Sequence, residues 1–156
     1  MFYKEMKRGN VGRLDKMDKY RLFFLLEGKV YLSGKEYGIH ILQEKEFILI
    51  PPNTDIQIGT FVPSRYALVC CNNFRNFHNK EYLQELHSSY KCHYSRKAIL
   101  PIREKLGVLL NNFSVYSITD YQFSTIHDTI FVILRSLYTA EEMASLLSPI
   151  LVNRKS

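Results

Sequence analysis

Six polar side chains interrupt apolar stretches in the first half of the chain and are candidates to bind a small molecule. They are Arg21, Tyr31, Tyr37, His40, Arg65 and Tyr66. Tyrosine suits the wall of a pocket, because its ring packs against apolar groups while its hydroxyl forms a hydrogen bond. The simpler interpretation of the two arginines is that they face solvent, as the alternation of side chains along a strand permits.

Histidine and cysteine are too scattered to predict a metal site. A site built on one strand needs imidazoles one residue apart, and His40 in GIHIL has no histidine at position 38 or 42. His87, Cys92 and His93 offer three ligands without a complementary pair, and an exposed turn explains them more simply. We therefore expect no metal and no other cofactor, with His40 making a local hydrogen bond.

No spacing in the sequence indicates a catalytic apparatus. Nucleophile motifs, phosphate-binding loops and dinucleotide fingerprints are absent, so we expect that the chain is not an enzyme. Cys70 and Cys71 are adjacent, so on a strand their thiols point to opposite faces and cannot form an ordinary disulfide. Packing in the interior is their expected role. The three cysteines of the chain fit a reducing cytoplasm.

Short strands separated by turn residues fill the region from residue 20 to about residue 73. Gly28, the pair Gly34-Lys35 and the pair Pro63-Ser64 stand where turns are expected. The stretch FILIPPNT runs four apolar residues into two prolines, which cannot donate ladder hydrogen bonds and so end a strand. The six expected strands are 20–27, 29–33, 36–42, 47–50, 55–62 and 65–72. They predict a β-sandwich or barrel.

Beyond about residue 95 the apolar residues follow helical spacing instead. Two to three helices are expected, two of them opened by capping boxes, Thr119 with Gln122 and Thr139 with Glu142. The helix that follows Thr119 is apolar on more than one face, so more than one surface must cover it.

We expect that a second copy of the chain covers part of this helical surface, in a twofold homodimer. The alternative is a monomer in which the helices pack wholly on the barrel. The predicted interface consists of Leu106, Leu110, Phe113, Phe123, Ile126, Ile130, Ile133 and Leu137.

The formal net charge of +6 is concentrated near the start of the chain and between residues 91 and 105. Such charge can favour a polyanion, but a solvated, slightly basic surface fits the sequence as well. The first 19 residues could form a mobile arm. No secretory signal is present, and no apolar run reaches the roughly 20 residues that span a bilayer.

The order of these features resembles the AraC family of transcription regulators. The segment FFLLEGKVYLSGKEYGIHILQEKEFILIPPNT is similar to the family's cupin-like sugar-binding domain, with a strand ending in LEG, a GKEY hairpin and a strand ending in IPP. The segment DTIFVILRSLYTAEEMASLLSPIL resembles the family's linker, which carries dimerisation. The resemblance covers roughly residues 20–151 and implies a mainly β, α+β fold, in which a jelly-roll barrel precedes two to three helices.

The resemblance also implies a function. Residues 1–95 would form the N-terminal arm and sensor barrel, and residues 96–156 a helical linker and dimerisation region. A sugar-like effector in the barrel would control DNA binding by a helix-turn-helix part absent from these 156 residues, and DNA would be contacted only through that part. The alternatives are a stand-alone small-molecule-binding cupin and a metal-free cupin enzyme, such as a sugar isomerase or epimerase. The enzyme would need a histidine or tyrosine acid–base pair inside the barrel.

Overall fold

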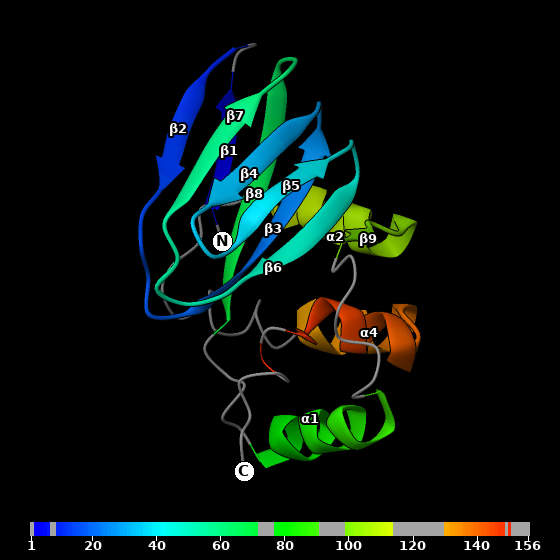
Figure 1. Ribbon diagram of the computed structural model, residues 1–156. Helices are drawn as coiled ribbons and strands as arrows, with labels where there is room; N and C mark the ends of the chain where they lie inside the picture. Colours follow the sequence, from blue (N-terminus) through cyan, green and yellow to red (C-terminus); the bar gives the residue numbers. More distant parts are fainter. Residues whose placement is uncertain are drawn as a thin grey trace.

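The computed structural model shows two antiparallel sheets with helices packed against one of them (Figure 1). It describes residues 2–6, 9–71, 77–90, 99–113, 130–148 and 150. Sheet A has the strand order β1-β8-β3-β6-β9, and sheet B has the order β2-β7-β4-β5.

The chain passes back and forth between the two sheets in the order of a jelly roll, with the hairpin of β4 and β5 in sheet B. Sheet A contains β1 (Phe2–Met6), β8 (Ser64–Cys71), β3 (Tyr20–Glu27), β6 (Glu46–Ile50) and β9 (Leu100–Pro101). Sheet B contains β2 (Val11–Leu14), β7 (Ile56–Thr60), β4 (Val30–Gly34) and β5 (Gly38–Leu42). The strands β1 to β8 make two interleaved four-stranded sheets, and β9 extends sheet A beside β6. The predicted fold class, a mainly β jelly roll with helices, is confirmed.

Sheet A is buried on both faces. In β3, Phe23 and Leu25 face the space between the sheets, while Leu22 and Phe24 face the helices. The four apolar residues of FILI divide in the same way, because Ile48 and Ile50 join the inner cluster and Phe47 packs on the helical side. A continuous apolar run is what burial on both faces requires.

The inner cluster fills the barrel with large apolar side chains. Its buried members are Leu14, Phe23, Leu25, Val30, Leu32, Leu42, Ile48, Ile50, Ile56, Ile58 and Tyr66. The rings of Phe23 and Tyr66 stack with their centroids 4.7 Å apart. The middle of the barrel is therefore a packed core, whose aromatic pair adds to the free energy gained by burial.

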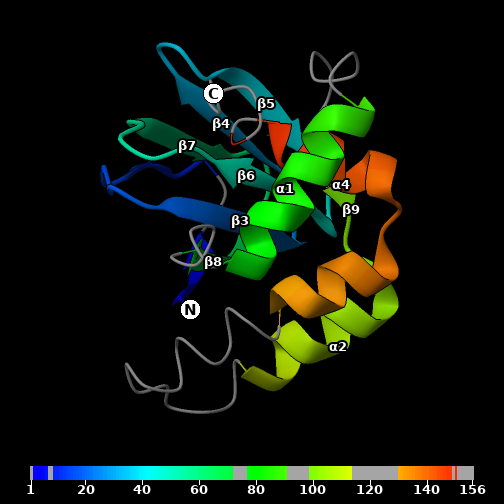
Figure 2. The same cartoon turned by 90° about the horizontal axis from the view of Figure 1, so that it is seen from below.

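The helices form a second core with the opposite face of sheet A. They are α1 (Phe77–Tyr90), α2 (Glu104–Phe113), the helical residues 130–137 and α4 (Ala140–Leu146). Figures 1 and 2 show them outside the sandwich, and one hydrophobic cluster joins side chains from all of them to β3, β6 and β8. Among the described residues, no helix is long and apolar enough to cross a membrane.

A cluster around Arg103 fastens the last helices to the start of α2. The Arg103 guanidinium lies 4.4 Å from the centre of the Tyr138 ring and donates to both carboxylate oxygens of Glu142, at 3.1 and 2.9 Å. It also donates to the Leu137 carbonyl, while the Tyr138 hydroxyl donates to the Pro101 carbonyl. Glu142 in turn closes the predicted capping box with Thr139, which is confirmed in both of its hydrogen bonds.

Three predicted interface residues, Leu106, Leu110 and Ile130, are buried within the chain itself. They pack in the cluster between sheet A and the helices, so a second chain is not needed to cover them. Ile133 and Leu137 are partly buried against the same cluster. The side chain of Phe113, the residues Phe123 and Ile126, and the capping box of Thr119 and Gln122 lie outside the described residues.

Four elements were not expected from the sequence, and one of them is β9, which lies where the start of a helix was predicted. The segment interpreted as an arm contributes β1, which pairs with β8, and β2, which pairs with β7. The region between β8 and β9 contains α1, whose Leu83 and Leu86 reach the helical core.

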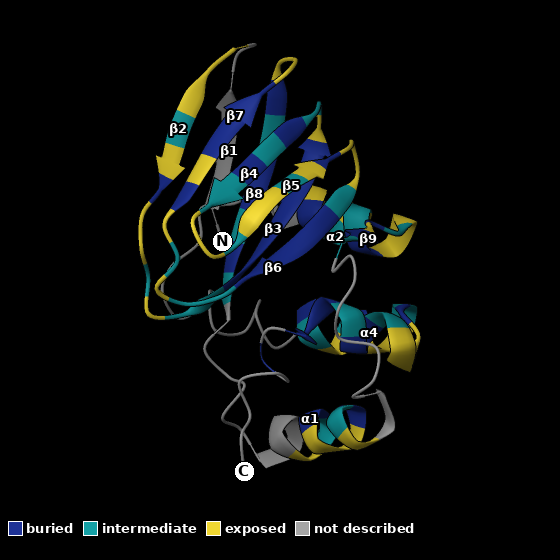
Figure 3. Ribbon diagram, viewed as in Figure 1, coloured by how far each residue is buried: buried dark blue, intermediate teal, exposed yellow. Residues whose placement is uncertain are grey.

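The outer face of sheet B carries exposed residues, as Figure 3 shows for β5, where Ile39 is 72% exposed.

We predict that Gly28→Ala destabilises the protein more than Gly38→Ala. Both glycines have positive φ, +97° and +82°, so alanine should cost about 1 kcal/mol of backbone strain at either site. A Cβ at Gly28 would also lie 2.1 Å from Ser64 Oγ and 2.6 Å from the Pro63 carbonyl oxygen, whereas one at Gly38 meets nothing within 4 Å. Urea unfolding should show an extra loss of about 1–3 kcal/mol for Gly28→Ala. Equal losses of stability for the two variants would contradict the close contact between Gly28 and the turn at Pro63 and Ser64.

We predict that Glu142→Gln removes an acid-dependent part of the stability. Burial alone would raise the pKa of Glu142, but hydrogen bonds from Thr139 and Arg103 and the charge of Arg103 outweigh it and lower the pKa. The ion pair therefore stabilises the fold above the ordinary glutamate pKa and is lost as the pH falls through the lowered value. Glutamine keeps the capping geometry, so it should cost about 1 kcal/mol at pH 7, and this cost should shrink as the pH falls below the ordinary glutamate pKa. A pH-independent difference in urea unfolding would contradict this assignment.

Candidate functional site

The candidate site lies at one end of the barrel, around Arg21. This residue is in β3, opposite Cys70 of β8 and Ile50 of β6, and it lies on the same face of the strand as Phe23 of the inner cluster. The side chain is 2% exposed, so the guanidinium is removed from water. A buried charge is expensive unless it is paired, so its partners decide what the site can do.

The Arg21 guanidinium is bonded along one side and open along the other. Nη1 donates to the Asp15 carbonyl oxygen at 2.8 Å. Nη2 points to the Thr54 carbonyl oxygen at 3.5 Å, which is the outer limit for a hydrogen bond, and the buried Nε has no acceptor among the described residues. Among the residues that the structure describes, no carboxylate lies within ion-pair distance of Arg21.

Burial lowers the pKa of Arg21, an effect that nearby Cys70, Asp15 and Tyr37 oppose. An arginine side chain does not lose its proton in a protein, so the guanidinium remains positive. The site therefore holds a buried positive charge that the described side chains do not neutralise.

Tyr37 supplies a neutral hydroxyl beside this charge. Burial raises the pKa of Tyr37, although Arg21 works in the opposite direction, so the phenol keeps its proton. Its hydroxyl donates to the Leu49 carbonyl oxygen at 3.4 Å, a long bond that can be exchanged for a better one. His40 lies against Tyr37 with ring centroids 4.4 Å apart, and its Nε2 donates to the Tyr37 carbonyl oxygen at 2.9 Å.

Two connections close the end of the barrel over Arg21. One is the segment 15–19 between β2 and β3, and the other is the PPNT corner that follows β6. The Asn53 amide donates to the Met17 carbonyl oxygen at 2.7 Å, and the sulfur atoms of Met17 and Cys70 lie 3.9 Å apart. The turn at the end of FILIPPNT thus helps to cover the guanidinium.

Cys70 is part of this site, although the sequence suggested only a packing role for it. Burial raises the pKa of its thiol, which Arg21 and Lys19 oppose, so the thiol stays neutral. No sequence signal could have singled it out, because its importance comes from the strand register that sets it opposite Arg21.

The structure brings together four of the six predicted ligand residues on the inner side of the barrel. Arg21, Tyr37 and His40 lie near the closed end, as described above. Tyr66 lies deeper, stacked on Phe23, where burial raises its pKa to about 12.

Tyr31 and Arg65 lie on outer faces instead. The ring of Tyr31 covers Gly59 so closely that a Cβ there would be 2.1 Å from it. Arg65 pairs with Glu27 at 3.2 Å on the side of sheet A that faces α2. The strand neighbours of Tyr31, Val30 and Leu32, occupy the interior, and alternation therefore directs Tyr31 outward.

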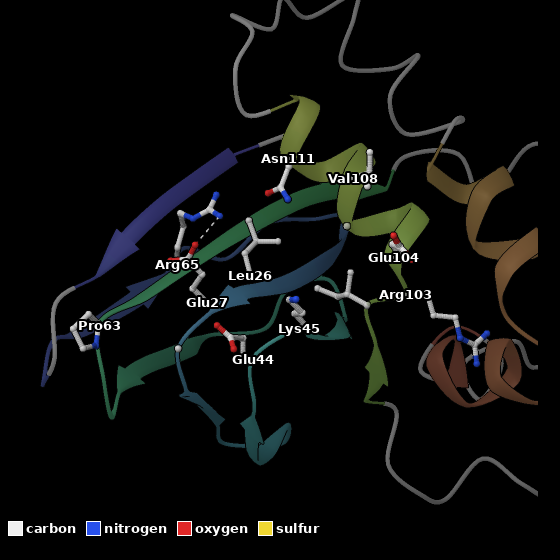
Figure 4. Close-up of a pocket in the computed structure, with 13 residues that line it drawn as sticks. Leu26, Glu27, Glu44, Lys45, Pro63, Arg65, Arg103, Glu104, Val108 and Asn111 are labelled. Carbon is white, nitrogen blue, oxygen red and sulfur yellow. Dashed lines mark hydrogen bonds and ion pairs between the residues drawn. The ribbon is translucent and has the colours of Figure 1, made fainter.

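A second concave feature is a groove of about 780 Å³ between α2 and the outer side of sheet A (Figure 4). It is lined by Leu26, Glu27, Gly28, Glu44, Lys45, Pro63, Arg65, Ile102, Arg103, Glu104, Gly107, Val108 and Asn111. Figure 4 shows the Arg65–Glu27 pair on one wall, while the Arg103 side chain leaves the groove toward α4.

The lining of this groove includes three acidic and three basic side chains, and one of the basic ones, Arg103, is already paired with Glu142. Lys45 lies in a turn with a φ of +62°. Its backbone carbonyl accepts a hydrogen bond from the Ile102 amide at 2.7 Å, and its amide donates to the Leu25 carbonyl at 2.9 Å. The groove therefore favours no single charge. The sequence could not indicate it, because four separate connections form it.

Solved structures match part of the chain. No protein-family model and no curated protein matches the sequence. A DUF861 family protein from Thermotoga maritima is similar over 44% of this chain and 75% of its own, with 16% identity and a TM-score of 0.38. A putative ethanolamine utilization protein Q from Salmonella typhimurium LT2 is similar over 44% of this chain and 53% of its own, with 18% identity and a TM-score of 0.38.

A cupin 2 conserved barrel domain protein from Leptotrichia buccalis gives a further match. It covers 42% of this chain and 31% of its own, with 12% identity and a TM-score of 0.40. Likeness at this level is of limited extent and carries no argument about function. The jelly-roll assignment therefore rests on the strand order of the chain itself.

We predict that Arg21→Met leaves the stability of the ligand-free protein nearly unchanged, whereas Arg103→Met lowers it. Methionine removes an unpaired buried charge at position 21, so the free energy of unfolding should change by less than about 1 kcal/mol or rise. At position 103 it removes the bonds to Glu142 and Leu137 and the contact with Tyr138, which should cost about 2–3 kcal/mol. Urea unfolding measures both. A loss at Arg21→Met as large as that at Arg103→Met would assign Arg21 a purely structural role.

Proposed function

We propose that this chain is the ligand-sensing and dimerisation domain of an AraC-like transcription regulator. A small molecule would bind at the Arg21 end of the barrel and change how the helices present an attached DNA-binding part. The observation that supports this proposal most directly is the position of β3 between the two cores.

Strand β3 connects the candidate site to the helices through adjacent residues. Arg21 faces the barrel interior, and the next residue, Leu22, packs in the cluster formed by sheet A and the helices. Phe23 and Phe24 repeat the same alternation. Because close-packed interiors transmit small shifts, a ligand that moves β3 by a fraction of an ångström must also change its packing against the helices.

The Arg103 cluster supports the same proposal from the helical side. It ties the start of α2 to Tyr138 and Glu142, so α2, residues 130–137 and α4 are connected by hydrogen bonds as well as by apolar contacts. A displacement of α2 would therefore reach the last helix. By linkage, an attached DNA-binding part that favours one arrangement of the helices would change the affinity for the ligand.

Dimerisation would use the surface of residues 130–137 that the described part of the chain leaves uncovered. Val132 is 64% exposed there, and Ile133 and Leu137 are only partly buried. A single exposed valine is ordinary on a protein surface, so the proposal relies on its being continuous with the partly buried Ile133 and Leu137. Cytoplasmic function in a reducing environment is part of the same proposal.

The other candidate functions have less support. A stand-alone binding protein would use the same Arg21 site without the coupling to the helices. A metal-free enzyme would need an acid–base pair, but His40 bonds to the backbone carbonyl of Tyr37 while the Tyr37 hydroxyl bonds to Leu49. An acid–base pair acts on the substrate, and in this arrangement both side chains are bonded to backbone carbonyls instead.

The proposal predicts that Val132→Asp abolishes dimerisation and Val108→Asp does not. Both valines are exposed on helices, at 64% and 54%, so neither substitution should unfold the protein. The mass in solution, measured by light scattering, should halve for Val132→Asp only.

In a second experiment, the chain is fused to a helix-turn-helix domain that binds a two-half-site operator only as a dimer. Operator binding should require Val132, and a monomeric wild-type protein with an inactive fusion would contradict the proposal.

A further inference from the structure

The open edge of the Arg21 guanidinium identifies a chemical group that this site can recognise. Nη1 donates to the backbone carbonyl of Asp15, whereas in the part of the chain that the structure describes Nε has no acceptor and Nη2 has only the long contact with the Thr54 carbonyl. Nε–H and one N–H of Nη2 are parallel, and this pair matches the two oxygens of a carboxylate. We propose that this edge binds the carboxylate group of a small organic acid, an inference that rests on the proposed sensing function and names its ligand class.

The charge balance of the site favours an anion. The side chain of Arg21 is buried, and among the described residues no carboxylate pairs with it. Two further charges act on this end of the barrel at longer range. Asp15 interacts with Arg21 from beyond ion-pair distance, and Lys19 adds a positive charge near Cys70, which lies opposite Arg21 on β8. A neutral sugar would leave the buried guanidinium uncompensated, whereas one carboxylate would neutralise it.

The surroundings of the guanidinium favour an acid with one charged group and an apolar remainder. Ile50 and Phe23, which neighbour Arg21 on the inner face, are apolar, and both are buried. The Tyr37 hydroxyl is the nearby neutral donor, and it can turn from its 3.4 Å bond with Leu49 to a ligand oxygen. A phosphate dianion would need more donors than one guanidinium edge and one hydroxyl, so the geometry points to a monocarboxylate.

Met17 is the side chain that would make way for this ligand. It contacts Cys70 through sulfur and belongs to the segment 15–19, which lies over the site. Methionine is unbranched and can change rotamer at little cost. The backbone bonds of this segment to Asn53 and Arg21 can persist when the side chain moves.

The test compares matched acids and amides on the whole chain. Butyrate, hexanoate and benzoate are titrated against butyramide, hexanamide and benzamide, and inorganic phosphate is included. The melting temperature should rise with acid concentration, on the order of 5 °C at saturation, and should not respond to the amides. Arg21→Met and Arg21→Lys should lower the affinity for the acid at least tenfold. Arg65→Met, which removes an arginine outside the barrel, should bind the acid as the wild type does.

The following results would overturn the assignment of Arg21 as a carboxylate-binding residue. Equal responses to acid and amide would show that the carboxylate is not read, and this comparison needs no variant. Unchanged acid binding by Arg21→Met would place the ligand elsewhere, and a response to phosphate alone would exclude the carboxylate. If acids fail but a neutral compound binds with an affinity that Arg21→Met lowers, this inference fails while the sensing function stands. If acids fail and no compound of a broad library binds, both fail.

Discussion

Burial of sheet A on both of its faces is the constraint on which the rest of the structure depends. Strands β3 and β6 consist almost wholly of apolar residues, with Phe23 and Ile48 on one side and Phe24 and Phe47 on the other. Sheet B covers the inner face, but nothing in a jelly roll covers the outer one. The helices after β8 meet that requirement, and the rings of Phe24 and Phe47, 5.0 Å apart, lie at the centre of the contact. The arrangement is therefore a sandwich with a third layer.

The same constraint makes Arg21 unusual. It occupies an interior position in a strand where every neighbouring side chain on that face is apolar or neutral, and the free energy cost of burying its charge is only partly recovered from backbone carbonyls. Stability alone would favour an apolar residue there. Arg103, by contrast, has a carboxylate, a carbonyl and an aromatic ring as partners, and its contribution to stability is evident.

The sequence predicts the strands well where turn residues separate apolar runs, as at Gly28 and after Ile50. It also predicts the start of α4, because a capping box is a local interaction between Thr139 and Glu142. The first two strands are missed because their charged residues conceal any alternation. Helix α1 is missed because the apolar side chains it buries, such as Leu83 and Leu86, are few in a polar stretch.

The sequence alone does not predict which polar side chains lie together inside the barrel. In YRLFFLLE both faces are apolar, so alternation divides the residues into two sets without showing which set faces the barrel. The register with β6 and β8 decides it, and places Arg21 inside and Arg65 outside. The apolar residues of the helices likewise do not show which surface covers them. In the structure, Leu106, Leu110 and Ile130 pack in one cluster with sheet A of the same chain.

The central claim is that Arg21 carries a buried charge with one unbonded edge, and nuclear magnetic resonance of the arginine side chains tests it most directly. With the Nε–H signal of Arg21 assigned by comparison with Arg21→Met, the account predicts a charged guanidinium whose Nε–H exchanges slowly with water and lacks the downfield shift of a carboxylate-bound group. Addition of a monocarboxylate should then move that signal downfield. Rapid exchange, as in an exposed arginine, or a carboxylate-like shift in the ligand-free protein would contradict the account.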